Sequence, residues 1–241
     1  MSNRPTVGSL FAGIGGFDLG FERAGYNILW QVEKDLFNQR ILKKHYPDAV
    51  LYGDIRDVDF NQVEPVDVLV GGFPCQDISS AGKKKGIRGE KSGLWSEYFR
   101  AIRTIRPRFA VIENVGNVAI RGLDVVLCDL AGVGYNATWE TISAAAFGAP
   151  HLRQRTFVVA YPDGESGSEF DVWSETRREI QQGEHISRRC ISAWVETGQP
   201  DIRSMDDGVS PGLDRLRNYS IGNAVIPQIT EYIGEKLIQW I

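Results

Sequence analysis

The feature that most constrains the fold of this chain is an apolar run, residues 66–70, that ends in the sequence GGFPC at residues 71–75. A short apolar run bounded by glycine and proline is typical of a buried strand. Open α/β sheets bind their ligands outside the carboxyl ends of the strands. The turn therefore presents the thiol of Cys75 where a ligand would lie, and we predict that Cys75 is a covalent nucleophile.

The amino-terminal part of the chain has the pattern that opens a nucleotide-binding βαβ unit. An apolar strand at residues 7–11 precedes a turn with Gly13, Gly15 and Gly16, and the apolar spacing predicts a helix over residues 17–24. Glycines let a ligand approach the backbone, and a helix N-terminus offers free N–H groups. The glycines do not complete the GxGxxG fingerprint, so a tight turn in any α/β protein explains them equally well.

Two acidic residues follow the next predicted strands and favour a nucleoside ligand. Glu33 ends the strand at residues 28–32 and lies 20 residues after Gly13, where an acidic side chain binds ribose hydroxyls in such folds. Asp54 follows the strand at residues 49–52, and at the same sheet edge it could accept a hydrogen bond from an adenine amino group. By itself, Asp54 would be interpreted as a helix cap.

A glycine-rich basic segment follows the cysteine turn. Residues 81–93 predict either a solvated surface loop or, because they follow the candidate nucleophile, a lid that closes over a polyanion. The helix predicted at residues 94–105 and its end carry Arg100, Arg103 and Arg106, three residues apart. A basic stripe for phosphates is one interpretation of this spacing, and an ordinary exposed helix face is the simpler one.

Charged residues at later strand ends complete the candidate site. Glu113 follows the apolar strand at residues 109–112, so it is either a general acid beside the nucleophile or a surface glutamate. Arg153 and Arg155 flank Gln154 at the start of another predicted strand, where guanidinium groups suit phosphate or oxyanion contacts.

Composition excludes several classes of protein. Cys75, Cys128 and Cys190 are widely spaced without a CxxC pair, which argues against a disulfide framework and a zinc site. A hydrophobic content of 42% suits one large α/β domain, and the net charge of -4 gives no global signal for nucleic acid. No apolar run is long enough to span a bilayer and residues 1–5 lack an apolar signal core, so we expect a cytoplasmic protein.

Five short stretches occur in a fixed order along the chain: Phe11-Ala12-Gly13-Ile14-Gly15-Gly16, Gly72-Phe73-Pro74-Cys75-Gln76, Glu113-Asn114-Val115, Arg153-Gln154-Arg155 and Gly222-Asn223-Ala224-Val225. Each stretch alone is a weak signal, and the ordered set is strongly specific. In this order they resemble the motifs of the cytosine-5 DNA methyltransferases, in particular of compact, phage-like members.

The resemblance implies a fold and a division of the chain. The fold would be α/β: a Rossmann-like S-adenosylmethionine-dependent methyltransferase fold with a mixed, mostly parallel sheet, helices on both faces and a small irregular recognition region. Residues 1–161 would form the catalytic and cofactor-binding domain, residues 162–212 a short target-recognition region, and residues 213–241 a segment returning to the catalytic domain. The composition of residues 162–212, rich in glycine, serine, glutamate and arginine, slightly favours disorder.

The resemblance also implies an activity, DNA (cytosine-5-)-methyltransferase. Cys75 would add to carbon 6 of the cytosine and so activate carbon 5 for methyl transfer. Glu113 would hydrogen-bond the base, Arg155 and Arg153 would orient that site, and Asn114 would hold the active-site loops together. Because a cytosine inside a duplex cannot reach the thiol, the base would be flipped out of the stack.

The implied ligands are S-adenosylmethionine and double-stranded DNA, and we expect a monomer. Lys34 stands where many relatives carry an apolar or aromatic side chain against adenine. The expected substrate-binding residues are Gln76, Ser79, Lys83, Arg88 and Asn114. The expected cofactor-binding residues are Phe11 at the sulfonium, Glu33 at the ribose, Asp54 at the adenine, and Ala12, Gly13, Gly15, Gly16, Ile55, Gly72, Pro74, Leu94, Asn223 and Val225 around them.

Two other activities remain open from the sequence. A tRNA cytosine-5 methyltransferase would fit the small recognition region and the acidic net charge, and an inactive cofactor-binding remnant would fit a shortened recognition region. An NAD-dependent oxidoreductase is set aside, because it rests only on the glycine turn and gives Cys75 no role.

Overall fold

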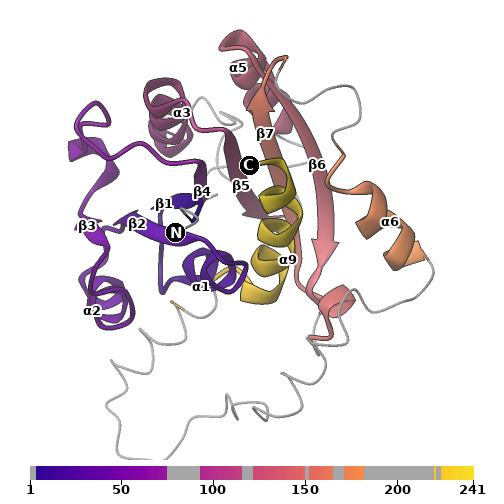
Figure 1. Ribbon diagram of the computed structural model, residues 1–241, viewed down its shortest axis with the longest axis horizontal. Coiled ribbons are helices and arrows are strands. Elements are labelled where there is room, and N and C mark those ends of the chain that lie inside the picture. Colours follow the sequence, from indigo (N-terminus) through magenta and orange to yellow (C-terminus); the bar gives the residue numbers. More distant parts are fainter. Residues whose placement is uncertain are drawn as a thin grey trace, which may run out of the picture.

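The computed structural model describes residues 4–74, 93–115, 122–149, 152–164, 171–181, 220 and 224–241. These residues form one seven-stranded sheet with the strand order β3-β2-β1-β4-β5-β7-β6 (Figure 1). The strands are β1 (Thr6–Leu10), β2 (Asn27–Val32), β3 (Val50–Tyr52), β4 (Val68–Gly72), β5 (Phe109–Val115), β6 (Tyr135–Ser143) and β7 (Gln154–Pro162).

The sheet is mixed and mostly parallel, as predicted. β1 to β5 run parallel to one another, while β7 is antiparallel to both β5 and β6. The strand order reverses between β1 and β4, and in open α/β sheets such a switch point is where ligands bind. The carboxyl ends of β1 and β4 therefore mark the expected ligand edge.

Helices cover both faces of the sheet, and the side chains of each strand alternate between two hydrophobic clusters. On β5, Ala110 and Ile112 belong to one cluster, and Phe109 and Val111 belong to the other. This burial on both faces explains why the strand sequences are continuously apolar. The helices are α1 (Gly16–Arg23), α2 (Leu36–His45), α3 (Gly93–Ile105), α5 (Leu123–Gly132), α6 (Ser174–Gln181) and α9 (Pro227–Leu237), with short 3-10 turns η1 (Ile55–Asp57), η3 (Ala144–Phe147) and η4 (Ile238–Trp240).

The possible basic stripe of α3 does not form as a free surface. Arg100 donates hydrogen bonds to the carbonyls of Ile55 and Val58, at 2.9 Å each, and its guanidinium lies 4.6 Å from the centre of the Phe60 ring. Arg106 donates to a backbone carbonyl and lies over an aromatic ring, that of Tyr135. These two arginines therefore hold neighbouring loops.

The compositional expectation of disorder in residues 162–212 is wrong for residues 171–181. Val172 and Trp173 are buried in the same cluster as α1 and α9, and the hydroxyl of Thr176 in α6 donates to that of Tyr232 in α9 at 3.0 Å. Average composition misses this because it does not show that a few residues, here Val172, Trp173 and Thr176, are buried together. Residues 182–212 lie outside the part of the chain that the structure describes, and the domain boundaries stay a prediction.

The carboxyl-terminal helix α9 packs directly against α1. The Thr230 hydroxyl donates to the Gly16 carbonyl at 3.2 Å, and a Cβ atom at Gly20 would lie 2.6 Å from Glu231 N and from the Pro227 carbonyl oxygen. Glycine at position 20 is thus required by the close approach of the two helices. Among the described residues, no helix has the length and apolar character needed to cross a membrane.

We expect Gly20→Ala to lower the free energy of unfolding by about 1–3 kcal/mol, because the added methyl group would overpack the contact between α1 and α9. Gly132→Ala in α5 is the matched control, since a Cβ there meets nothing within 4 Å and alanine favours a helix. Urea denaturation of both variants measures the difference. Equal unfolding free energies for the two variants would contradict this packing.

Candidate active site

Three adjacent strands build the candidate catalytic cluster, at the carboxyl ends of β4 and β5 and at the amino end of β7. Gly72 of β4 pairs with Glu113 of β5, and Val115 of β5 pairs with Arg155 of β7. The Arg155 Nε atom lies 2.8 Å from Glu113 Oε1, in a largely buried ion pair. A Cβ at position 72 would collide with Glu113 Oε2, so Gly72 leaves the space that this carboxylate occupies.

A buried asparagine connects this cluster to the cysteine turn. Asn114 is 4% exposed, and its Nδ2 atom donates to the Phe73 carbonyl oxygen at 3.2 Å. This bond holds the backbone just before Pro74 and Cys75, which agrees with the loop-holding function expected of Asn114. The expected residues Cys75, Gln76, Ser79, Lys83, Arg88 and Asn223 lie outside the described residues.

Burial makes the carboxyl group of Glu113 a weaker acid than an exposed glutamate. Loss of solvation raises the pKa of Glu113 from 4.5 to about 7, although the positive charges of Arg155 and Arg153 oppose the shift. Burial also lowers the pKa of Arg153. A carboxyl group that titrates near neutrality can both donate and accept a proton. Because Glu113 is buried, the alternative of an ordinary surface glutamate is wrong.

The glycine turn after β1 lies at the switch point of the sheet. Phe11, Gly13 and Gly15 have φ angles of 53°, 57° and 89°. A bulky non-glycine residue in this region is strained, and such strain is concentrated at functional sites. Counting only described residues and leaving out the two adjacent in sequence, a Cβ at Gly13 would have one neighbour within 4 Å, the Phe11 carbonyl oxygen at 4.0 Å. The backbone there leaves room for a ligand to approach.

Glu33 lies beside the glycine turn, as predicted. Its Oε2 atom accepts the Gly13 N–H at 2.7 Å and its Oε1 atom accepts the Asp35 N–H at 2.6 Å. Each carboxylate oxygen still has a lone pair for a hydroxyl group. Burial raises the pKa of Glu33. Turn and carboxylate together fit the diol of a nucleoside, so the residues present fit an adenosyl cofactor.

The carboxylate of Asp54 is already engaged by two cations. Lys34 Nζ lies 2.9 Å from Asp54 Oδ2, and the Arg56 guanidinium and N–H bind the same carboxylate. These hydrogen bonds hold the pKa of Asp54 well below its usual range. Asp54 also caps η1, so the helix-cap interpretation is confirmed, and its contact with adenine stays a prediction.

The remaining predicted cofactor residues surround this edge. Gly16 faces Val225, whose carbonyl oxygen would lie 2.6 Å from a Cβ at position 16. Ile55 is buried in the hydrophobic cluster under α3, and Leu94 packs against this cluster. Ala12 is buried and Pro74 is exposed.

Sequence reasoning missed several partners. Arg56 was not singled out, although it lies two residues from the predicted Asp54. Asp18, a fully buried carboxyl in the first turn of α1, was also missed. An acidic residue inside an otherwise apolar helix face was the available signal.

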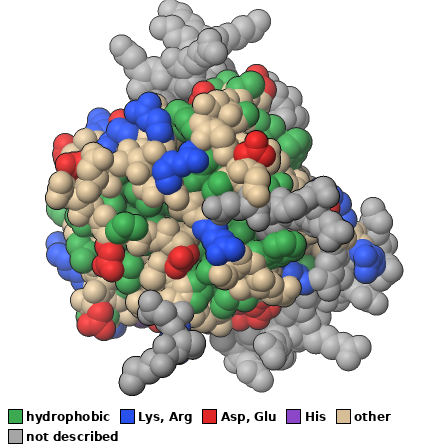
Figure 2. Space-filling view, turned by 45° about the horizontal axis from the view of Figure 1, so that its top comes forward, with side chains coloured by type: hydrophobic (Ala, Val, Ile, Leu, Met, Phe, Trp, Pro, Cys, Tyr) green, Lys and Arg blue, Asp and Glu red, His purple; other side chains and the backbone are tan. Residues whose placement is uncertain are grey.

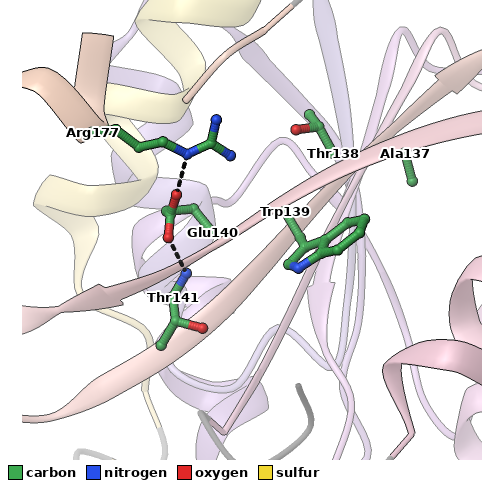
Figure 3. Close-up of a pocket in the computed structure, with 6 residues that line it drawn as sticks. All are labelled: Ala137, Thr138, Trp139, Glu140, Thr141 and Arg177. Carbon is green, nitrogen blue, oxygen red and sulfur yellow. Dashed lines mark hydrogen bonds and ion pairs between the residues drawn. The ribbon is translucent and has the colours of Figure 1, made fainter. Parts of the chain in front are cut away.

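A cavity of about 390 Å³ lies along β6, the strand at one edge of the sheet (Figure 3). Glu140 Oε2 accepts from Arg177 Nε at 2.6 Å, while Glu140 Oε1 accepts the N–H of Thr141 at 3.1 Å. These side chains cover part of an edge strand, which is how natural sheets avoid unwanted strand pairing. Among the residues that the structure describes, none of the predicted site residues lines this cavity.

Charge on the described surface is mixed. Figure 2 shows acidic and basic side chains interspersed over the face that it draws, without one dominant field of either sign among the coloured residues. The net charge of -4 agrees with this distribution.

A model of the family described as C-5 cytosine-specific DNA methylase matches residues 6–205. The chain belongs to this family. It is 32% identical over 204 residues to the Type II methyltransferase M.NgoFVII of Neisseria gonorrhoeae, covering 82% of this chain and 53% of the relative. It is 35% identical over 174 residues to M.Bsp6I of a Bacillus species, covering 68% of this chain and 55% of the relative.

The chain thus spans about half the length of these curated relatives. The methyltransferase EhMeth of Entamoeba histolytica has the same fold, with a TM-score of 0.69 at 14% identity and 98% of both chains covered. The predicted family and methyltransferase fold are therefore confirmed.

Replacing Glu113 should change how stability depends on pH. Its folded-state pKa is raised, so the folded protein binds the proton more tightly and wild-type stability falls as pH rises from about 4.5 to about 7. Glu113→Gln removes this loss. We expect the unfolding free energy of the variant, relative to wild type, to rise by about 2–3 kcal/mol across this window in urea denaturation. A pH-independent difference would refute the assigned shift.

Proposed function

We propose that this chain is a DNA (cytosine-5-)-methyltransferase that uses S-adenosylmethionine. The observation that carries the proposal is the buried Glu113–Arg155 ion pair, joined through Asn114 to the backbone that leads into Cys75. Family membership and the fold support it. A nucleophile, a neutral-range acid and an orienting cation are the groups that activation of a cytosine ring requires.

The cofactor would lie along the edge formed by the glycine turn and Glu33. Bound there, S-adenosylmethionine supplies an electrophilic methyl group on its sulfonium. Glu33 would accept the ribose hydroxyls, the open backbone at Gly13 would allow close approach, and the ring of Phe11 would face the sulfonium charge. The predicted positions Asn223 and Val225 would close the pocket from the carboxyl-terminal side.

The chain's own residues would make carbon 5 of cytosine nucleophilic. The thiolate of Cys75 would add to carbon 6, while the protonated carboxyl group of Glu113 donates to the ring nitrogen and accumulates the compensating negative charge. Arg155 would keep Glu113 oriented, and Arg153 would add positive charge. After methyl transfer, loss of the carbon 5 proton would expel the thiolate and restore the aromatic ring.

The proposed substrate is duplex DNA with the target cytosine flipped out of the stack. Gln76, Ser79, Lys83 and Arg88 are proposed to contact the base or its flanking phosphates. Residues within 162–212 are proposed to select the target sequence.

We expect Cys75→Ser to abolish methyl transfer, because a serine hydroxyl is far less ionised than a thiol at neutral pH. Cys128→Ser is the matched control, since Cys128 is an exposed free cysteine on α5. Labelled methyl transfer to duplex DNA and to tRNA, followed by bisulfite sequencing of the DNA, reports reaction, substrate and target together.

Three results would contradict the proposal. Methylated cytosines that persist with Cys75→Ser would show that Cys75 is not the nucleophile. Label on tRNA alone would show that the substrate is tRNA rather than DNA. Cofactor binding without transfer to DNA of mixed sequence would indicate a binding remnant.

A further inference from the structure

One buried carboxyl group outside the catalytic cluster bridges the strands beneath the glycine turn. Asp18, the third residue of α1, is fully buried. Its Oδ1 atom accepts from Gln31 Nε2 at 2.8 Å, and its Oδ2 atom accepts from Ser9 Oγ at 3.3 Å. Ser9 of β1 and Gln31 of β2 are direct partners in the parallel ladder. One carboxyl group thus ties α1 to both strands.

The bridge lies directly under the proposed cofactor turn. α1 begins after Gly15, which has a φ of 89° and supplies no capping side chain. A Cβ at Gly15 would be 3.7 Å from Asp18 Oδ2. Asp18 is the acidic residue in the first turn of α1. A negative charge at this position interacts favourably with the N-terminal end of the helix dipole.

Among the described residues, few polar or charged groups from the surrounding elements act on Asp18. Ser9 and Gln31 are 0% and 1% exposed and carry no charge. Glu22 of the same helix acts on Asp18 electrostatically, and Asp18 in turn acts on the phenol of Tyr46, which follows α2. From α9, Glu231 pairs with Arg23 at 3.7 Å.

We propose that Asp18 is a positioning residue for the cofactor: its ionised carboxylate, held by Ser9 and Gln31, fixes the glycine turn in the conformation that binds the adenosyl group. The inference rests on the proposed use of S-adenosylmethionine. It concerns the support of the turn rather than a contact with the ligand.

Ionisation matters because the carboxylate accepts from both donors and places a negative charge in the first turn of α1. Burial raises the pKa of Asp18 to about 6, against the hydrogen bonds from Gln31 and Ser9 that favour the ionised form. Protonation of Oδ2 reverses the bond with Ser9, whose hydroxyl must then accept, and it removes the negative charge from the N-terminal end of the helix. The turn is then held less firmly, and cofactor affinity falls as pH falls through about 6.

Isothermal titration of the intact chain with S-adenosylhomocysteine, from about pH 5.5 to pH 8, tests the proposal without requiring turnover. Wild type should bind about twofold to fourfold more weakly at the acidic end, because a carboxyl group with a pKa of about 6 is protonated in about three quarters of the molecules at pH 5.5. Asp18→Asn should be weaker by a similar factor at pH 8 and should have a shallower pH profile.

Ser9→Ala keeps the test decisive if Asp18→Asn fails to fold. Removing a hydrogen bond that favours the ionised carboxylate should move the midpoint of the affinity profile to higher pH. An unchanged midpoint, or an Asp18→Asn variant with wild-type affinity and slope, would overturn the inference alone. Wild type that fails to bind S-adenosylhomocysteine and S-adenosylmethionine at every pH would overturn the proposed function as well.

Discussion

The buried ion pair between Glu113 and Arg155 depends on three strands at once. β5 supplies the carboxylate, β7 supplies the guanidinium, and Gly72 of β4 leaves the space that the carboxylate occupies. Desolvating two charges costs several kcal/mol per ion, so such a pair is a poor way to stabilise a fold. It is better explained by chemistry, since burial is what moves the pKa of Glu113 to about 7.

The same sheet edge brings the catalytic cluster and the cofactor turn together. β1 and β4 are neighbours at the point where the strand order reverses, so the glycine turn after β1 and the cysteine turn after β4 emerge side by side. Glu33 binds the N–H of Gly13 in the first turn, Asp18 ties the helix that follows this turn to β1 and β2, and Asn114 binds the backbone at the start of the second turn. On the proposed function, this is how a methyl donor and a thiol meet at one base.

Much of this could be predicted from the sequence because it depends on order along the chain. Apolar runs located the strands, and residues just after them, Glu33 and Glu113, had to lie at one edge of a parallel sheet. Partnerships across strands depend on register and packing, which no local pattern determines. Hence the cations that bind Asp54, Lys34 and Arg56, were not foreseen, and composition slightly favoured disorder for the segment in which Trp173 is buried.

The central claim, covalent attack by Cys75 on a cytosine, has a direct test in mass spectrometry of the protein after incubation with S-adenosylmethionine and duplex DNA containing 5-fluorocytosine. Fluorine at carbon 5 leaves no proton to remove after methyl transfer, so the thiolate cannot be expelled and the adduct persists. The account predicts one nucleotide adduct on the peptide that contains Cys75, formed only with the cofactor present. An adduct on another residue, or methyl transfer to ordinary cytosine without any adduct on the fluorinated duplex, would contradict it.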